Sequence, residues 1–243
     1  MFAEKLYRSY LHNLHISASK ENIKNIRNLY NKVSGTIVLD VGCDDGRVTS
    51  DIITNINNSD CVGIDINHGQ LIRAASHHLL PCLADASKGF PFQKESFDIL
   101  ISNQVIEHVA DIDAFMNEVY RVVKYGGYAI ISTENASSWV NVIASAIGYQ
   151  MFSMTNISSK RLGIGNPFAI HRNSNTKAPG WTHKTIFSLR ALIEFSEVYD
   201  FSVVDVVSSG YFPLPSFCAR LDPIHGHFIT ILLHKPLQTK PAR

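Results

Sequence analysis

Residues 38–46 read Val-Leu-Asp-Val-Gly-Cys-Asp-Asp-Gly, an apolar run that passes directly into a short segment bounded by two glycines. Gly42 permits a sharp turn and the close approach of a ligand to the backbone, and Gly46 permits close packing of whatever follows. If a helix follows, its first N–H groups are free to bind polar ligand atoms. The stretch therefore predicts a buried strand, a nucleotide-site loop and a helix, although a glycine turn of this kind can also be purely structural.

Polar side chains follow the next apolar runs at the point where each run ends. Asp65 lies about 20 residues beyond the glycine loop, the spacing at which an acid in a βαβ unit accepts hydrogen bonds from ribose hydroxyls. Asp85 ends the following short run, and Asn103 ends the run after that. Because ligands of open parallel sheets lie outside the carboxyl ends of the strands, we expect these side chains to converge on one cleft.

Short apolar runs alternate with helical or loop-like segments along most of the chain, which predicts an α/β fold with a parallel sheet. Most of these runs lack polar alternation, as expected for strands covered on both faces. The expected strands are 36–41, 61–66, 81–84, 97–102, 128–132, 201–207 and 228–233, and the clearest helix begins at Ile112 and is stopped by Gly126-Gly127. A polar helix over 18–33 belongs to an N-terminal helical extension, residues 1–34, and one domain follows over 35–243.

Composition narrows the functional classes. The chain has 243 residues, of which 45% are hydrophobic and 18% charged, and a net charge of +1, so nothing favours nucleic acid as a partner. No apolar stretch approaches the roughly 18 residues of a membrane span, and the N-terminal residues lack the apolar core of a signal peptide. We expect a soluble, cytoplasmic protein. His225 and His227 lack a nearby third ligand, so no metal site is expected.

The glycine loop also separates two nucleotide cofactors. The dinucleotide fingerprint GxGxxG fails, because position 44 is Asp and the next glycine after Gly42 is Gly46. The combination instead resembles the class I S-adenosylmethionine-dependent methyltransferases, in particular the type-11 group that includes quinone-biosynthesis enzymes. The resemblance covers about residues 36–134 and rests on residues 40–46, Gly63-Ile64-Asp65-Ile66, Ala84-Asp85-Ala86, Phe90-Pro91-Phe92, Ser96-Phe97-Asp98, Glu107-His108-Val109 and Arg121-Val122-Val123-Lys124-Tyr125-Gly126-Gly127.

The resemblance implies a Rossmann-like seven-stranded sheet with S-adenosylmethionine as the cofactor. It implies that Asp40 and the loop with Gly42, Cys43 and Gly46 hold the methionine part, that Asp65 holds the ribose hydroxyls, and that Asp85 with Ala86 holds the adenine. Ile66 and Asn103 complete the expected cofactor site. The commonest loop of the family is DxGxGxG, and this chain has Asp44 where a glycine is usual. Asp tolerates a left-handed backbone better than most side chains.

The sequence says less about the acceptor side, the part of the site that would bind the methyl acceptor. In the family the Glu107-His108-Val109 stretch faces the methyl acceptor, and His108 is the best-placed base for an acceptor that must lose a proton. Equally, His108 could be a helix-start residue bonded to backbone, and Glu107 could cap the next helix. The strand rhythm is lost over about 135–182, which predicts a cap inserted after the fifth strand.

The expected reaction is the transfer of a methyl group to a small molecule or glycan precursor, to a hydroxyl oxygen in preference to a nitrogen or carbon. The alternatives are a catalytically idle methyltransferase-like subunit that binds the cofactor or a partner protein and, least favoured, a nicotinamide oxidoreductase.

Overall fold

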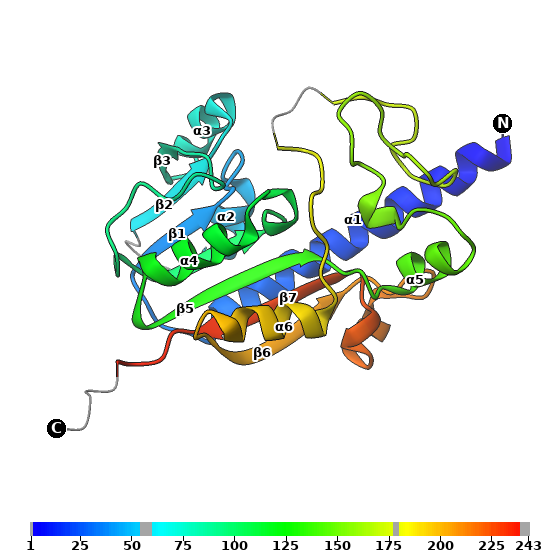
Figure 1. The fold of residues 1–243 in the computed structure, drawn as a ribbon. Helices are drawn as coiled ribbons and strands as arrows, with labels where there is room; N and C mark the ends of the chain where they lie inside the picture. Colours follow the sequence, from blue (N-terminus) through cyan, green and yellow to red (C-terminus); the bar gives the residue numbers. More distant parts are fainter. Residues whose placement is uncertain (1, 54–59, 177–179, 239–243) are drawn as a thin grey trace.

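Strand β1 (Ile37–Val41) lies inside a seven-stranded sheet of order β3-β2-β1-β4-β5-β7-β6 in the computed structural model, which describes residues 2–53, 60–176 and 180–238 (Figure 1). The other strands are β2 (Asp60–Asp65), β3 (Leu80–Leu83), β4 (Phe97–Asn103), β5 (Val123–Glu134), β6 (Ser202–Ser209) and β7 (Phe228–His234). The first five strands pair in parallel, and β7 runs antiparallel to both β5 and β6. The α/β prediction and all seven strand positions are confirmed, whereas the reversed direction of β7 was not predicted.

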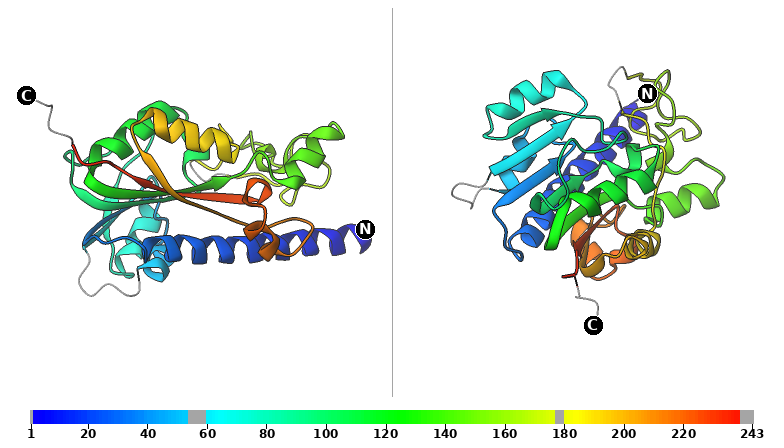
Figure 2. Two further views of the ribbon diagram at one scale, coloured as in Figure 1. Left: turned by 90° about the horizontal axis from the view of Figure 1, so that it is seen from below. Right: turned by 60° about the vertical axis from the view of Figure 1, so that its left-hand side comes forward.

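Helices cover both faces of the sheet and make two hydrophobic cores. Helices α1 (Phe2–Tyr30), α2 (Arg47–Ile52) and α3 (His68–Ala75) lie on one face, and α4 (Ile112–Val122) and α6 (Leu189–Val198) lie on the other (Figure 2). Successive residues of β4 alternate between the two cores, since Leu100 packs on the α4 side and Ile99 and Ile101 pack on the α1 side. Each such buried aliphatic side chain stabilises the fold by about 1.5–3 kcal/mol, which fixes the register of the central strands.

Helix α1 is longer than the 18–33 segment that periodicity predicts. Its second half packs on the sheet through fully buried side chains such as Ile26 and Leu29. Between them and the first half lies Asn22, which is 2% exposed and donates hydrogen bonds to the side chains of Asn103 (3.0 Å) and Ser132 (2.9 Å). The first half projects beyond the sheet toward the segment after β5 (Figures 1 and 2).

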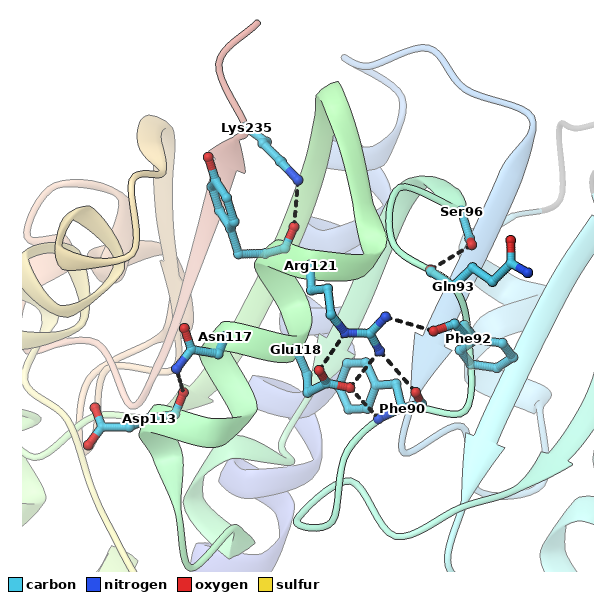
Figure 3. A network of polar contacts seen from close by, with 10 residues as sticks. Phe90, Phe92, Gln93, Ser96, Asp113, Asn117, Glu118, Arg121 and Lys235 are labelled. Atoms are coloured by element: carbon cyan, nitrogen blue, oxygen red, sulfur yellow. Dashed lines mark hydrogen bonds and ion pairs between the residues drawn. The ribbon is translucent and has the colours of Figure 1, made fainter. Parts of the chain in front are cut away.

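The loop between β3 and β4 is fastened to α4 by a polar network (Figure 3). The guanidinium of Arg121 donates to the carbonyl oxygens of Phe90 (3.0 Å) and Phe92 (2.7 Å) and to the carboxylate of Glu118, which also accepts from the N–H of Phe90 at 2.6 Å. Two motifs of the family resemblance thus have a structural role. Contrary to expectation, α4 is not stopped by Gly126-Gly127: it ends at Val122, and both glycines lie within β5.

The segment after β5 contains α5 (Trp139–Ala146) and the short 3₁₀ helix η2 (Phe152–Met154) but is otherwise irregular. Further 3₁₀ helices are η1 (Ile106–His108) after β4, and η3 (Ser216–Arg220) and η4 (Pro223–His225) before β7. None of the helices in the described part of the chain is long and apolar enough to cross a membrane.

Candidate active site

The glycine loop has the backbone that its sequence predicts. Gly42 and Gly46 have φ values of 77° and 80°, and Asp44 adopts a left-handed conformation with φ 49°. A side chain at Gly42 would place its Cβ 2.4 Å from Cγ2 of Val105, and one at Gly46 would place it 3.0 Å from Cα of Ala74 in α3. The first glycine therefore permits contact with the segment after β4, and the second permits contact with α3.

Asp65 is hydrogen-bonded to this loop, and Ile66, the apolar residue that follows it, is exposed. Its carboxylate accepts hydrogen bonds from the backbone N–H of Asp44 (3.0 Å) and of Asn67 (2.7 Å). Ile66, directly after it, is 45% exposed at the carboxyl end of β2. An acid fixed by backbone groups beside an exposed aliphatic side chain suits a ribose with a flat base next to it, so these residues fit the adenosine part of the expected cofactor.

Asp85 and Ala86 follow β3 at the same edge of the sheet. The carboxylate of Asp85 accepts from the N–H (3.0 Å) and hydroxyl (2.6 Å) of Ser87, and Lys88 lies 3.3 Å away. These contacts lower the pKa of Asp85, with the Ser87 hydroxyl as the largest cause. Ala86 is half-buried against the core. The assignment of both residues to the adenine stays a prediction, and the Asp85 side chain is already held by its neighbours.

The side chains of Cys43 and Asn103 are both engaged within the protein, and the assignment of these residues to the cofactor site stays a prediction. The Cys43 side chain is buried, and its Sγ would lie 2.6 Å from a Cβ at Gly63, so it faces the interior and offers a cofactor only its backbone. The Asn103 amide accepts from Asn22 of α1. This hydrogen bond places the Asn103 side chain in the network that Asn22 forms with Asn103 and Ser132.

Asp40 is a buried carboxyl at the root of the loop. It is 6% exposed and accepts a hydrogen bond from the hydroxyl of Thr49 in α2. Burial and the nearby charge of Asp65 raise its pKa to about 6, although the Thr49 hydroxyl acts in the opposite direction. A cationic group of a ligand placed beside it would favour the ionised form, as the ammonium of a methionine moiety does.

A cavity of about 740 Å³ lies next to the carboxyl ends of β4 and β5. Its walls come mainly from the first half of α1, from η1, from the irregular segment after β5, and from the segment between β6 and β7 with the first residue of β7. The lining is mainly aliphatic and aromatic, and it includes Leu11, Ile143, Phe152, Phe168, Trp181 and Phe212. The glycine loop does not itself line it. Gln104 does line it, and a Cβ at Gly42 would meet Val105 beside Gln104, so the loop and the cavity both adjoin the segment that follows β4.

Glu107 does not cap the helix that follows, which was one alternative from the sequence, because Asp111 is the N-cap of α4. Glu107 is 1% exposed and lines the cavity. One of its oxygens accepts from the hydroxyl of Thr133 at 2.9 Å, and the other, Oε1, is buried and has no hydrogen-bond partner in the described part of the chain. Burial raises its pKa to about 8, with the nearby charge of Glu134 as a further cause.

His108 points to the same cavity and has a histidine neighbour. Its Nδ1 lies 3.3 Å from the carbonyl oxygen of Thr182, and its ring meets the ring of His183 edge to face at 4.6 Å. Burial and the adjacent His183 lower the pKa of His108 to about 4. The imidazole is therefore neutral at pH 7. Because a carbonyl oxygen only accepts, Nδ1 carries the proton and Nε2 keeps its lone pair.

The cavity has further polar groups that sequence patterns did not assign to it, although His227 was considered as a metal ligand. Glu134, His183 and His227 all line it. Although burial acts in the opposite direction, His227 and His183 lower the pKa of Glu134, so this carboxylate is ionised at neutral pH. Their only sequence signal is that Glu134 ends a strand. The histidines come from loops 44 residues apart, which periodicity cannot connect.

The model of a methyltransferase domain family matches residues 39–131. Among curated proteins, the chain is 29% identical over 104 residues to a ubiquinone biosynthesis O-methyltransferase of Chelativorans. The aligned region covers 42% of this chain and 41% of that protein. It is 28% identical over 167 residues to the phthiotriol/phenolphthiotriol dimycocerosates methyltransferase of Mycobacterium tuberculosis, covering 63% and 62%. The matches thus span less than two thirds of these relatives.

Solved structures extend the likeness over nearly the whole chain. A SAM-dependent methyltransferase of Thermotoga maritima, described as a possible histamine N-methyltransferase, superposes with a TM-score of 0.62 at 18% identity and covers 96% of this chain and 97% of that one. A methyltransferase of Mesorhizobium loti gives 0.56 at 16% identity, covering 86% and 95%. At these identities the likeness concerns the fold. The strand order, the glycine loop with its acids and the family match together identify a domain of the class I S-adenosylmethionine-dependent methyltransferases in this chain.

Proposed function

We propose that this chain transfers the methyl group of S-adenosylmethionine to a hydroxyl oxygen of a small, neutral and largely apolar acceptor bound in the cavity. The observation that carries the proposal is the contact of Val105 with Gly42, because it joins the loop expected to hold the methionine part to the segment that presents Glu107 and His108 to the cavity. In this arrangement a sulfonium at the loop and an oxygen in the cavity can meet along one line.

The charges of the lining support a neutral acceptor. No Lys or Arg is among the described residues that line the cavity, whereas the carboxyl groups of Glu107 and Glu134 are. A carboxylate or phosphate on the acceptor would find no Lys or Arg among these lining residues and would face the ionised carboxylate of Glu134, at a cost of several kcal/mol for a buried charge. The apolar walls favour aromatic or aliphatic acceptors over the glycan precursor that the sequence also allows.

The reaction needs few groups. The acceptor oxygen attacks the methyl carbon, the C–S bond breaks, and its electron pair returns to sulfur. The hydroxyl proton must leave, and Nε2 of His108 is the lone pair best placed to accept a hydrogen bond from it. With a pKa of about 4, His108 orients the hydroxyl and does not keep the proton, which passes on to solvent water as the C–O bond forms. The segment 135–182, of which 177–179 lie outside the described residues, closes the cavity and would select the acceptor.

The test incubates the purified chain with methyl-labelled cofactor and a cell extract, then separates neutral lipids and small molecules from protein, nucleic acid and acidic metabolites. Label in the neutral fraction that is lost with Asp65→Ala supports the proposal. Label in protein or nucleic acid would contradict it. Tight S-adenosylhomocysteine binding with no labelled product in any fraction would instead favour an idle methyltransferase-like subunit.

A further inference from the structure

Three metal-ligating groups meet at the polar end of the cavity. One carboxylate oxygen of Glu107 and one ring nitrogen each of His108 and His183 lie within 4.8 Å of one another. Glu107 is 1% and His183 9% exposed, so two of the three are buried and the trio is not a chance cluster of surface charges. From this geometry we infer that Glu107, His108 and His183 bind a divalent transition-metal ion of the zinc type, with an open coordination position facing the cavity.

Each histidine is oriented as a metal ligand would be. Nδ1 of His108 faces the carbonyl oxygen of Thr182, and Nδ1 of His183 faces the carbonyl oxygen of Ser153. Both Nδ1 atoms therefore carry protons, and both Nε2 atoms keep lone pairs. Histidines that ligate metals almost always donate their other N–H to a carbonyl or carboxylate in this way, which fixes the ring and its tautomer.

The carboxylate has the matching arrangement. The Thr133 hydroxyl holds one oxygen of Glu107, while Oε1 is buried and has no hydrogen-bond partner among the described residues. An unpaired buried carboxylate oxygen is costly, and a cation is the ligand that removes this cost. Glu134, at the end of β5, lines the same cavity, so a further acidic side chain lies at this end for a cation.

The backbone holds the two halves of the site together. The carbonyl oxygen of Glu107 accepts from the N–H of Lys184 at 2.7 Å and of Thr185 at 3.3 Å. His183, directly before them in sequence, is thereby fixed against η1 although it lies 75 residues beyond His108. The ligands are set before any ion binds.

The ligand set indicates the class of metal. Two imidazoles and one carboxylate suit zinc and its first-row neighbours, whereas magnesium and calcium prefer oxygen alone. Three protein ligands leave a position for a further group, as in catalytic zinc sites. Because all three residues line the cavity, that position faces the acceptor. This part of the inference rests on the proposed function: with an ion bound, Nε2 of His108 would bind the ion instead of accepting a hydrogen bond from the acceptor. The acceptor oxygen would then bind at the open position, its hydroxyl pKa would fall, and the proton would pass to water.

The experiment uses the full-length chain stripped of metal by a chelator and titrated with Zn²⁺ by calorimetry and with Co²⁺ by visible absorption. We expect one ion per chain, a rise in Tm with Zn²⁺, and an affinity at least 100-fold weaker in Glu107→Gln and His183→Asn. His171→Asn is the matched control, because His171 lines the same cavity but lies outside the trio, and it should bind both ions like the wild type. Unchanged S-adenosylhomocysteine affinity shows that each variant is folded.

Zn²⁺ binding that is absent, or equally strong in the wild type and all three variants, would overturn the metal site and leave methyl transfer untouched. The other outcome is that the wild type binds one ion per chain, that only Glu107→Gln and His183→Asn lose this binding, and that the protein methylates nothing. This result would uphold the metal site and overturn the proposed function.

Discussion

Asp40→Asn should change how the stability of the cofactor-free protein depends on pH. The folded-state pKa of Asp40 is about 6, raised from 3.8 chiefly by burial. A carboxyl whose pKa is raised on folding contributes stability below the unfolded pKa, and this contribution is lost as the pH rises through the folded pKa. The wild type should therefore lose stability between about pH 4 and pH 6 at this site, and the variant, which cannot ionise there, should not.

The magnitude follows from the shift. About two pKa units at about 1.4 kcal/mol each give about 3 kcal/mol as the largest change in the stability difference between variant and wild type over this range. Asparagine keeps a side-chain oxygen that can accept from the Thr49 hydroxyl, so the local hydrogen bond survives. All other groups titrate alike in both proteins and cancel in the difference.

The measurement is urea unfolding of both proteins at half-unit steps from pH 4.5 to pH 7.5, repeated with saturating S-adenosylhomocysteine. Without ligand, the variant should gain on the wild type as the pH rises. With ligand, the gain should shrink or reverse, because the ammonium of the ligand favours ionised Asp40. Two stability curves that stay parallel without ligand over the whole range would refute the argument.

Three further predictions concern the loop and the sheet. Gly42→Ala should cost about 2–4 kcal/mol of stability, from a positive φ and from a Cβ 2.4 Å from Val105, and Val105→Ala should restore only the second part in a double-mutant cycle of chemical unfolding. Asp65→Ala should weaken S-adenosylhomocysteine binding by roughly 2–4 kcal/mol in calorimetry with the circular dichroism unchanged, and equal affinity would remove Asp65 from the site. Lys124 and two backbone N–H groups lower the pKa of Asp98 to about 2, although partial burial acts in the opposite direction. Asp98→Asn should therefore lower the free energy of unfolding by about 1 kcal/mol at pH 6, after a discount for solvent screening, and by less as the pH falls from about 4 to about 2. A loss of stability that does not depend on pH in urea unfolding would contradict this.

The central sheet could be predicted because its signals are local. Strands covered on both faces read as continuous apolar runs, and the turn after β1 needs positive φ at positions where glycine and Asp stand. The direction of β7 is not a local property, because a run such as Phe228–His234 is equally apolar in either direction. Only its pairing with β5 and β6 decides between them. The end of α4 was misjudged for a related reason, since Gly126 and Gly127 are used inside a strand.

The acceptor side could not be predicted, because buried polar side chains rather than periodicity hold it. Asn135 donates to the carbonyl oxygens of Ile224 (2.7 Å) and Gly226 (2.8 Å), and Asn141 donates to that of Asn135 (2.8 Å). A chain segment held in this way needs no apolar stripe, so its sequence resembles that of an exposed loop.

The same reasoning explains why the glutamate–histidine trio stayed hidden. Glu107 and His108 adjoin each other in sequence, but their third partner, His183, returns from the far end of the irregular segment and is placed by backbone hydrogen bonds to Glu107. Two neighbouring polar residues after a strand have many structural uses, and only the third one makes them a site. Since the cofactor loop is built from one continuous stretch and the acceptor side from α1, η1, the segment after β5 and β7, acceptor specificity can change without disturbing cofactor binding. We therefore expect substitutions along the cavity wall, such as Ile143→Ala or Phe168→Ala, to alter which acceptor is methylated while the affinity for S-adenosylhomocysteine stays within about twofold of the wild type, since neither side chain reaches the loop.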